Sequence, residues 1–328
     1  MSDELVPEVV GKPAVAGAVA EASPVPPVSP ERAAFRGVSG TKRTTKGWFL
    51  DTGWRHLVGL AVVVFALFPV LWVLSAAFST TGLNSQSMVP EEVSLDNFRA
   101  LMTDDNHPPF LTWMRNSMLV GAITSIVTVF LCALAAYAFS RLRFKGRRPG
   151  MTFLLLVQMF PNLLALTALF LFMDRVAKSF PAFGLGTTWG LILIYLGGAL
   201  GVNTWLMKGF FDSIPRELDE AAKVDGATHA QIFFKVILPL AAPVLAVIAL
   251  LSFVASQSEF IIADVILGQN DQQRTAAVGL SRFILAGFDS RWGPFAAGSL
   301  IVALPVVILW LFLQRFVVTG LTAGAVKG

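Results

Sequence analysis

Residues 215–227 read PRELDEAAKVDGA, a polar stretch that lies between two apolar segments. Pro215 suits the first turn of a helix, and the acidic residues that follow it complement the positive end of a helix dipole. Gly226 comes next, where a left-handed backbone conformation costs glycine little. Thr228 and Gln231 have the spacing of a capping box. The stretch therefore predicts a short helix, a sharp turn and a second helix that begins after Thr228 and enters a membrane.

The composition of the chain is that of a membrane protein. Of its 328 residues, 55% are hydrophobic and 14% are charged, whereas about a quarter of the residues of a soluble domain are charged. A helix needs an apolar run of about 20 residues to cross the hydrocarbon core. Six runs qualify: Leu57–Phe78, Met114–Phe139, Met151–Met173, Thr187–Met207, Val236–Ser256 and Phe295–Phe316. The sequence thus predicts an all-α, polytopic membrane protein with six transmembrane helices.

The basic residues predict the orientation of these helices. Lysines and arginines crowd the segments before the first run, after the second and between the fourth and fifth. Because cytoplasmic segments are enriched in such residues, both termini and the 215–227 stretch are expected on the cytoplasmic side. Residues 1–50 are rich in proline and small residues, which predicts a disordered cytoplasmic tail.

Neither enzyme chemistry nor nucleic-acid binding is indicated. The net charge is +4, and the basic residues already have an explanation in membrane orientation. Cys132 is the single cysteine, and the three histidines are too widely spaced for a metal site. The sequence contains no phosphate-binding loop and no nucleophile elbow. We therefore expect no catalytic residue, no metal and no cofactor on this chain.

The stretch resembles the EAA loop of permease subunits in binding-protein-dependent ABC importers. The resemblance rests on six residues of the stretch and on the Ile-Leu-Pro triplet at 237–239: Glu220, Ala221, Ala222, Asp225, Gly226 and Ala227. It implies a type I ABC importer permease fold, in which the six residues form a coupling helix that docks on a cytoplasmic ATPase. The chain then divides into the tail 1–50, a first helix and extracytoplasmic loop 51–112, a permease core 113–316 with coupling loop 213–235, and a cytoplasmic tail 317–328.

Three further segments resemble carbohydrate importers in particular: Trp113–Ser117, Ala135–Arg141 and Met159–Pro161. The C-terminus, Gly320–Gly328, is similar to the shorter permease subunit of maltose/maltodextrin importers. The resemblance implies a bacterial plasma-membrane complex with a second, different permease, a cytoplasmic ATPase dimer that holds ATP and Mg, and an extracytoplasmic sugar-binding protein. Import of maltose/maltodextrin-like sugars is the expected function. Another oligosaccharide, a polyol or glycerol phosphate is the alternative substrate.

Polar side chains within the apolar runs are candidates for the path of a polar solute. They are Asn116, Gln158, Asn162, Tyr195 and Ser252. Hydrogen bonding between helices is the alternative role for each, since an unsatisfied amide is costly in hydrocarbon. The middle of each run is nearly free of charged residues, which argues against an ion-coupled carrier.

A second extracytoplasmic loop is expected at Gln257–Pro294. Its turn-forming run is suited to a loop tip: Gly268, Gln269, Asn270 and Asp271. In the maltose importers that the chain resembles, this loop enters the cleft of the binding protein. These four residues are therefore expected to contact a binding protein.

Deletion of residues 2–40 should leave assembly and uptake unchanged, because a tail of that composition cannot bury enough apolar surface to order itself. The deletion retains Lys42, Arg43 and Lys46, which preserve the local charge bias. Uptake by cells at matched expression levels is the measurement. A loss of uptake would instead assign the tail a partner contact.

Overall fold

The computed structural model describes residues 52–80, 92–103, 110–268, 270–285 and 291–325. These residues are almost entirely helical, and the one extended pairing among them is an isolated bridge between Ser79 and Val93. The all-α fold predicted from the sequence is confirmed. Contacts divide the chain into two units, residues 1–64 and 65–328. The predicted tail, residues 1–50, lies outside the described residues.

Helix α3 (Trp54–Phe78) belongs partly to each unit. In the first unit its residues up to Val64 are exposed and mostly apolar, a composition suited to contact with lipid. In the second unit its end packs on α15 (Trp292–Ala325) through four buried alanines: Ala76, Ala77, Ala296 and Ala297. Such small side chains let two helices approach closely.

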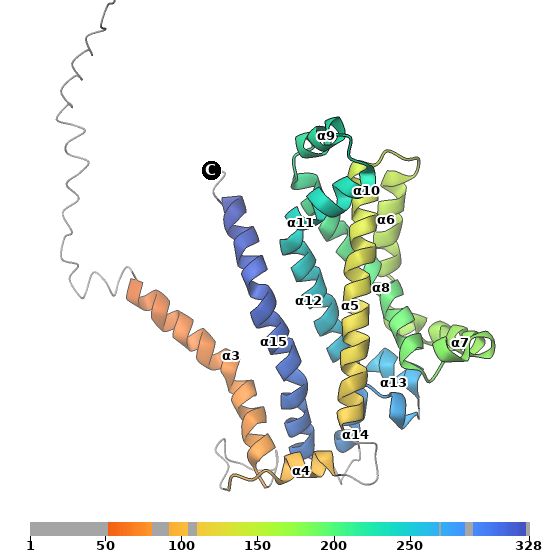
Figure 1. The fold of residues 1–328 in the computed structure, drawn as a ribbon. Coiled ribbons are helices and arrows are strands. Elements are labelled where there is room, and N and C mark those ends of the chain that lie inside the picture. The colour runs from red at the N-terminus through yellow and green to blue at the C-terminus, as the bar shows by residue number, and fades with distance from the viewer. Residues whose placement is uncertain (1–51, 81–91, 104–109, 269, 286–290, 326–328) are drawn as a thin grey trace, which may run out of the picture. The chain divides into compact units, whose positions relative to one another are not determined.

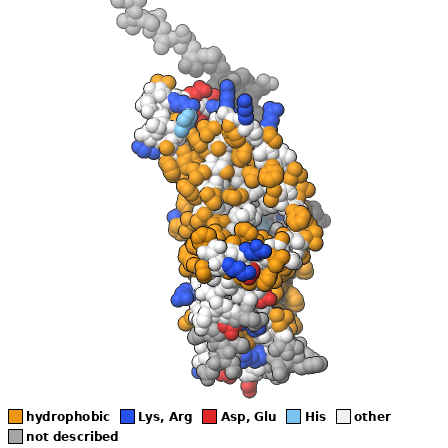
Figure 2. Space-filling view, turned by 90° about the vertical axis from the view of Figure 1, so that its right-hand side faces the viewer, with side chains coloured by type: hydrophobic (Ala, Val, Ile, Leu, Met, Phe, Trp, Pro, Cys, Tyr) orange, Lys and Arg blue, Asp and Glu red, His pale blue; other side chains and the backbone are white. Residues whose placement is uncertain are grey.

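The core of the second unit is built around α5 (Phe110–Arg141). This helix packs against α8 (Thr188–Ser213) and α12 (Ala242–Ser258). Gly121 of α5 has no room for a side chain, because a β-carbon there would overlap Phe253 of α12. Figure 2 shows hydrophobic side chains over the middle of one face, with charged side chains at its upper end and smaller charged groups in the middle and below it.

Four described helices are long and apolar enough to cross a membrane: Trp54–Phe78, Phe110–Arg141, Thr188–Ser213 and Trp292–Phe316. Two bent helix pairs bring the number to six if each pair is one span. The first pair consists of α6 (Arg147–Gln158) and α7 (Asn162–Ser179), which meet at 97°. The second pair joins residues 229–240 to α12 at 78°. The predicted third and fifth spans are therefore broken rather than straight.

Prolines lie at or beside both breaks. Pro161 directly precedes α7. The second break follows three short elements: α10 (His229–Ile232), the π-helix η4 (Phe233–Ile237) and α11 (Leu238–Leu240). Pro239 has no N–H to donate, and its ring crowds the carbonyl group four residues earlier, which lies inside the π-helix. The wider helical turn and the bend accommodate the proline.

The predicted extracytoplasmic loops contain folded elements. The first loop holds α4 (Asp96–Met102), a short helix. Its neighbour Ser94 accepts a hydrogen bond from the backbone N–H of Asp96 at 3.0 Å. The other connecting elements are short: η3 (Pro181–Phe183), α13 (Ile261–Leu267), η5 (Asp271–Gln273) and α14 (Ala276–Leu285). The described part of the second predicted loop is mostly helical, and its helices bury apolar residues such as Ile266, Leu267 and Val278.

Gly279 of α14 faces the indole ring of Trp113, and a β-carbon at this position would overlap the ring. Gly279→Ala should therefore reduce the free energy of unfolding by about 1–3 kcal/mol, the usual cost of overpacking. Gly197→Ala is the matched control, because nothing lies within 4 Å of the added carbon. Denaturant unfolding in detergent measures both variants. Equal stability of the two would contradict the packing described for α14.

Candidate functional site

The polar stretch 215–227 contains α9 (Glu217–Val224), which lies at one end of the second unit in Figure 1. Its first turn carries three acidic residues, as predicted. Pro215 lies before the helix, whereas the sequence predicted it in the first turn. Ile214, held extended in front of this proline with ψ of 124°, ends α8, and α9 begins at Glu217.

The turn after α9 is the one that the sequence predicts. Gly226 has φ of +81°, in the left-handed region. Its N–H donates to the carbonyl oxygen of Lys223 at 3.0 Å, and the N–H of Ala227 donates to that of Ala222 at 2.9 Å. This pair of bonds is a Schellman motif, which satisfies the last carbonyl groups of the helix.

The capping box predicted for the second helix is also confirmed. The Thr228 hydroxyl accepts from the backbone N–H of Gln231 at 3.3 Å. The Gln231 side chain accepts in return from the backbone N–H of Thr228 at 2.8 Å, and α10 begins at His229. Hydrogen bonds between residues close in sequence thus fix the geometry of α9, the turn at Gly226 and the start of α10.

The predicted coupling residues differ in exposure. Four of them are exposed: Glu220, Ala221, Asp225 and Gly226. Ala222 and Ala227 are half-buried and pack against the core that contains Tyr137 and Phe233. Sequence reasoning missed Leu218 and Val224, which are 42% and 88% exposed and lie on one helix face with Ala221. Each lies three residues from Ala221, and this spacing could have identified them from the sequence.

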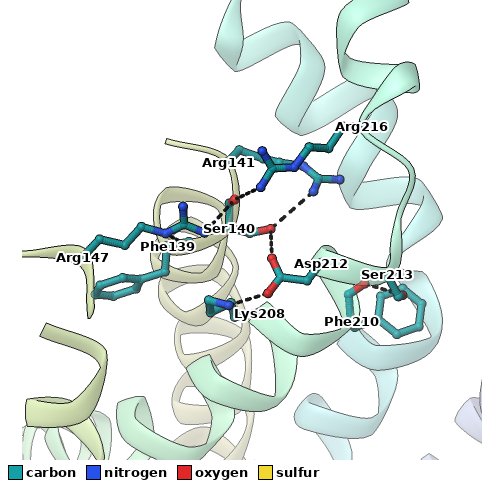
Figure 3. A network of polar contacts seen from close by, with 9 residues as sticks. All are labelled: Phe139, Ser140, Arg141, Arg147, Lys208, Phe210, Asp212, Ser213 and Arg216. Atoms are coloured by element: carbon teal, nitrogen blue, oxygen red, sulfur yellow. Dashed lines mark hydrogen bonds and ion pairs between the residues drawn. The ribbon is translucent and has the colours of Figure 1, made fainter. Parts of the chain in front are cut away.

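A polar network joins the ends of α5 and α8 to the segment before α9, as Figure 3 shows, and an ion pair extends it to α9 itself. Arg141, the last residue of α5, forms an ion pair with Asp219 of α9. Ser140 donates to Asp212 of α8 at 2.6 Å, and Lys208 pairs with the same carboxylate. The sequence alone does not indicate this ion pair, because Arg141 and Asp219 lie far apart in the chain.

Arginines also cap the C-terminal end of α5. Arg147 donates to the carbonyl oxygens of Phe139 at 2.5 Å and Ser140 at 3.1 Å. Arg216 donates to the Ser140 carbonyl oxygen at 3.4 Å. These guanidinium groups satisfy carbonyl groups that have no partner in the helix, and their charge complements the negative end of its dipole.

Most of the candidate path residues have partners within the chain. Asn116 donates to the carbonyl oxygens of Gln272 and Arg274 at 2.8 and 2.9 Å. Gln158 accepts from the backbone N–H of Val202 at 2.5 Å, and the Tyr195 hydroxyl donates to Glu259 at 2.7 Å.

Two candidate path residues show no such bond. The hydroxyl oxygen of Ser252 is buried and has no hydrogen-bond partner in the described part of the chain. The side chain of Asn162 lies outside the described residues. The structure does not join the candidates into one network, and their contact with solute stays a prediction.

The predicted loop tip is held against α5 and α8. Asn270 donates to the Gly186 carbonyl oxygen at 3.1 Å, and Trp113 donates to that of Asp271 at 3.2 Å. Asp271 pairs with Arg274, whose side chain is buried. Burial lowers the pKa of the Arg274 guanidinium from its ordinary value, and the nearby charge of Arg282 acts in the same direction.

Two residues of the tip complete its description. Gly268 has φ of +57°, so the turn begins at a position that favours glycine. Gln269 lies outside the described residues. The described part of the tip is therefore an anchored turn at the surface. Its contact with a binding protein stays a prediction.

No group of three or more histidine, cysteine, aspartate or glutamate side chains among the described residues is placed to hold a metal ion.

The chain matches known transport proteins over most of its length. Residues 128–321 match the family described as "Binding-protein-dependent transport system inner membrane component". The chain is 39% identical, over 283 residues, to the maltose/maltodextrin transport system permease protein of Vibrio vulnificus (strain YJ016), covering 83% of this chain and 95% of the relative. It is 37% identical, over 274 residues, to the galactooligosaccharides transport system permease protein of Bacillus subtilis (strain 168), covering 83% and 94%.

A solved structure shares the fold. It is the crystal structure of a bacterial ABC transporter involved in the import of the acidic polysaccharide alginate. The TM-score is 0.64 at 24% sequence identity, with 83% of this chain and 98% of the other chain covered. The resemblance to carbohydrate ABC importer permeases inferred from the sequence is thus confirmed. This multi-pass chain therefore belongs to the family of inner membrane components of binding-protein-dependent transport systems.

Proposed function

We propose that this chain is the translocation subunit of a bacterial importer for maltose/maltodextrin-like oligosaccharides, driven by ATP hydrolysis on a partner ATPase. The observation that carries the proposal is α9, an exposed helix whose bounds are fixed by a Schellman turn and a capping box. Membership of the binding-protein-dependent family, with relatives named for maltodextrins and galactooligosaccharides, supports an oligosaccharide as the solute.

The outer face of α9 supports its role as the dock for the ATPase. Leu218, Ala221 and Val224 form an exposed apolar stripe, and Glu217 and Glu220 are exposed beside it. Such a stripe can be buried against a groove of a partner, while the carboxylates pair with basic groups at its rim. ATP and Mg bind to that ATPase dimer, which closes and pushes α9.

The positions of the basic residues support the orientation of the chain. The end of the second unit that carries α9 also carries Arg141, Arg147 and Arg216, which suits the cytoplasmic side. The turn at 268–274 belongs on the opposite side, where a sugar-binding protein delivers its solute. A second, different permease completes the translocation path with this chain.

A neutral solute suits the interior of the helices. No Asp, Glu, Lys or Arg occurs in residues 116–140 of α5, 188–207 of α8 or 242–258 of α12. A cation for a phosphate group or an ionisable side chain for proton coupling would be expected there in a glycerol phosphate importer or an ion-coupled carrier. The proposal is tested by uptake of labelled maltodextrin into proteoliposomes of the complete complex. ATP-independent uptake that an uncoupler abolishes would refute it.

Gly226→Val should release the ATPase from the complex. A branched residue at φ of +81° is strained by about 1–3 kcal/mol, which distorts the turn that fixes α9. Co-purification of the ATPase with the permease is the measurement. The matched control is Gly186→Val, which places the same residue at φ of +78° in the turn before α8. Normal co-purification with Gly226→Val would show that α9 is not the dock.

Replacing Gln269 and Asn270 with glycine and serine should lower the hydrolysis of ATP that the binding protein stimulates. The change removes two side chains of the tip, including the bond from Asn270 to the Gly186 carbonyl oxygen. It leaves Asp271 and Gln272, whose contacts with Arg274 and Asn116 also anchor the turn. Hydrolysis is measured in proteoliposomes with saturating binding protein, and hydrolysis without binding protein is the internal control. Unchanged stimulation would remove this turn from the mechanism.

A further inference from the structure

The inward face of α9 is held to the rest of the chain by an ion pair. Of its eight residues, all of them described, Asp219 is the one that is buried. Its Oδ2 atom lies 2.7 Å from Nε of Arg141, and the two side chains are 9% and 5% exposed. The remaining inward contact of the helix is made by Ala222, which is half-buried against the core.

Stability alone is a weak reason for such a pair. Two charges lose their hydration when they are buried, and apolar residues of similar volume often stabilise a protein equally well or better. The other acidic residues of α9, Glu217 and Glu220, remain exposed at no such cost. What a buried ion pair between two helices adds is a specific partner, because either charge left alone in the interior would be costly.

The contacts around the pair tie the end of α5 to both ends of the segment that links α8 to α9. Arg141 donates to the Ile214 carbonyl oxygen at 2.9 Å, directly after α8. Arg216, directly before α9, donates to the Ser140 carbonyl oxygen at 3.4 Å. The Ser140 hydroxyl donates to Asp212 in the last turn of α8. Figure 3 shows Arg141 and Arg216 converging on Ser140.

Helix α5 connects this end of the second unit to the other. It is continuous over 32 residues, or about 48 Å at 1.5 Å per residue. Near its beginning, Trp113 and Asn116 donate to the backbone of the turn at 271–274. A displacement of its C-terminal end is therefore a displacement of the helix that holds the predicted binding-protein contact.

We propose that Asp219 and Arg141 are positioning residues that make α9 and α5 move as one body. A push of the ATPase on α9 then reaches α5 directly, in addition to passing through the covalent links of α9 to α8 and α10. The inference rests on the proposed function of α9 as the ATPase dock. It extends that function by naming the helix that receives the motion and the contact that transmits it.

The test uses the complete complex with Asp219→Asn, which removes the carboxylate charge and keeps the side-chain shape. In a Cys132→Ser background, spin labels are attached to cysteines at Lys223 on α9 and Leu134 on α5, both of which are exposed. In the parent protein the interspin distance should stay the same without nucleotide and with trapped ATP. In Asp219→Asn it should differ between the two states, and sugar transported per ATP hydrolysed should fall severalfold while the ATPase still co-purifies.

Two further variants separate a positioning role from simple damage. Asp219→Asn with Arg141→Gln removes both charges, so that no unpaired charge stays buried, and it should remain uncoupled. The exchange Asp219→Arg with Arg141→Asp restores an ion pair and should recover part of the coupling. Asp174→Asn is the matched control, because it breaks an exposed pair with Lys178 within α7 and should leave coupling unchanged.

Normal coupling in the variant that lacks both charges would overturn the inference, because the single variant would then be harmful through its unpaired charge. An interspin distance that stays constant in Asp219→Asn would also overturn it. Failure of the docking proposal has a different signature, namely normal ATPase co-purification with Gly226→Val, and would overturn both proposals together.

Discussion

In hydrocarbon there is no water to hydrogen-bond the backbone, so each membrane-crossing segment must satisfy its N–H and C=O groups internally. The described residues follow this constraint with helices, and the breaks in those helices are few and specific. One break contains Pro161 between α6 and α7, and the other follows the π-helix η4 and Pro239. Because a proline removes a donor and crowds a carbonyl group, bends at these places are a direct consequence of the sequence.

The same constraint places polar side chains. Asn116 and Tyr195 have bonds with other segments of the chain, since an unsatisfied polar group in hydrocarbon is costly. The charged residues of the polar network lie at helix ends, where Arg147 and Arg216 satisfy the carbonyl groups that end α5. A polar residue in an apolar run is therefore a sign of helix attachment first, and of a solute path only with further support.

Helix α5 contacts other parts of the second unit along its whole length. Close packing on α8 and α12 fixes its middle, where Gly121 leaves no space for a side chain. Polar contacts fix its two ends, to the turn at 271–274 and to α9. If the proposed ATPase and binding-protein contacts lie on opposite sides of the membrane, a helix attached to both proposed contact regions is a direct route for coupling them.

The sequence by itself determined the features that depend on neighbouring residues. Apolar runs of sufficient length gave the spans, and Gly226, Thr228 and Gln231 gave the turn and the capping box around α9. These features follow from backbone rules that act over a few residues.

Tertiary structure decided the contacts between residues far apart in the chain. Nothing local distinguishes Asp219 from its exposed neighbour Glu220, or Arg141 from the other arginines near it, until α5 and α9 are brought together. In the same way, the turn that the sequence predicted as a loop tip is anchored, because Trp113 and Asn116 reach it from another helix. Pairing of this kind is set by packing of whole helices, and that packing depends on the entire chain rather than on any one segment.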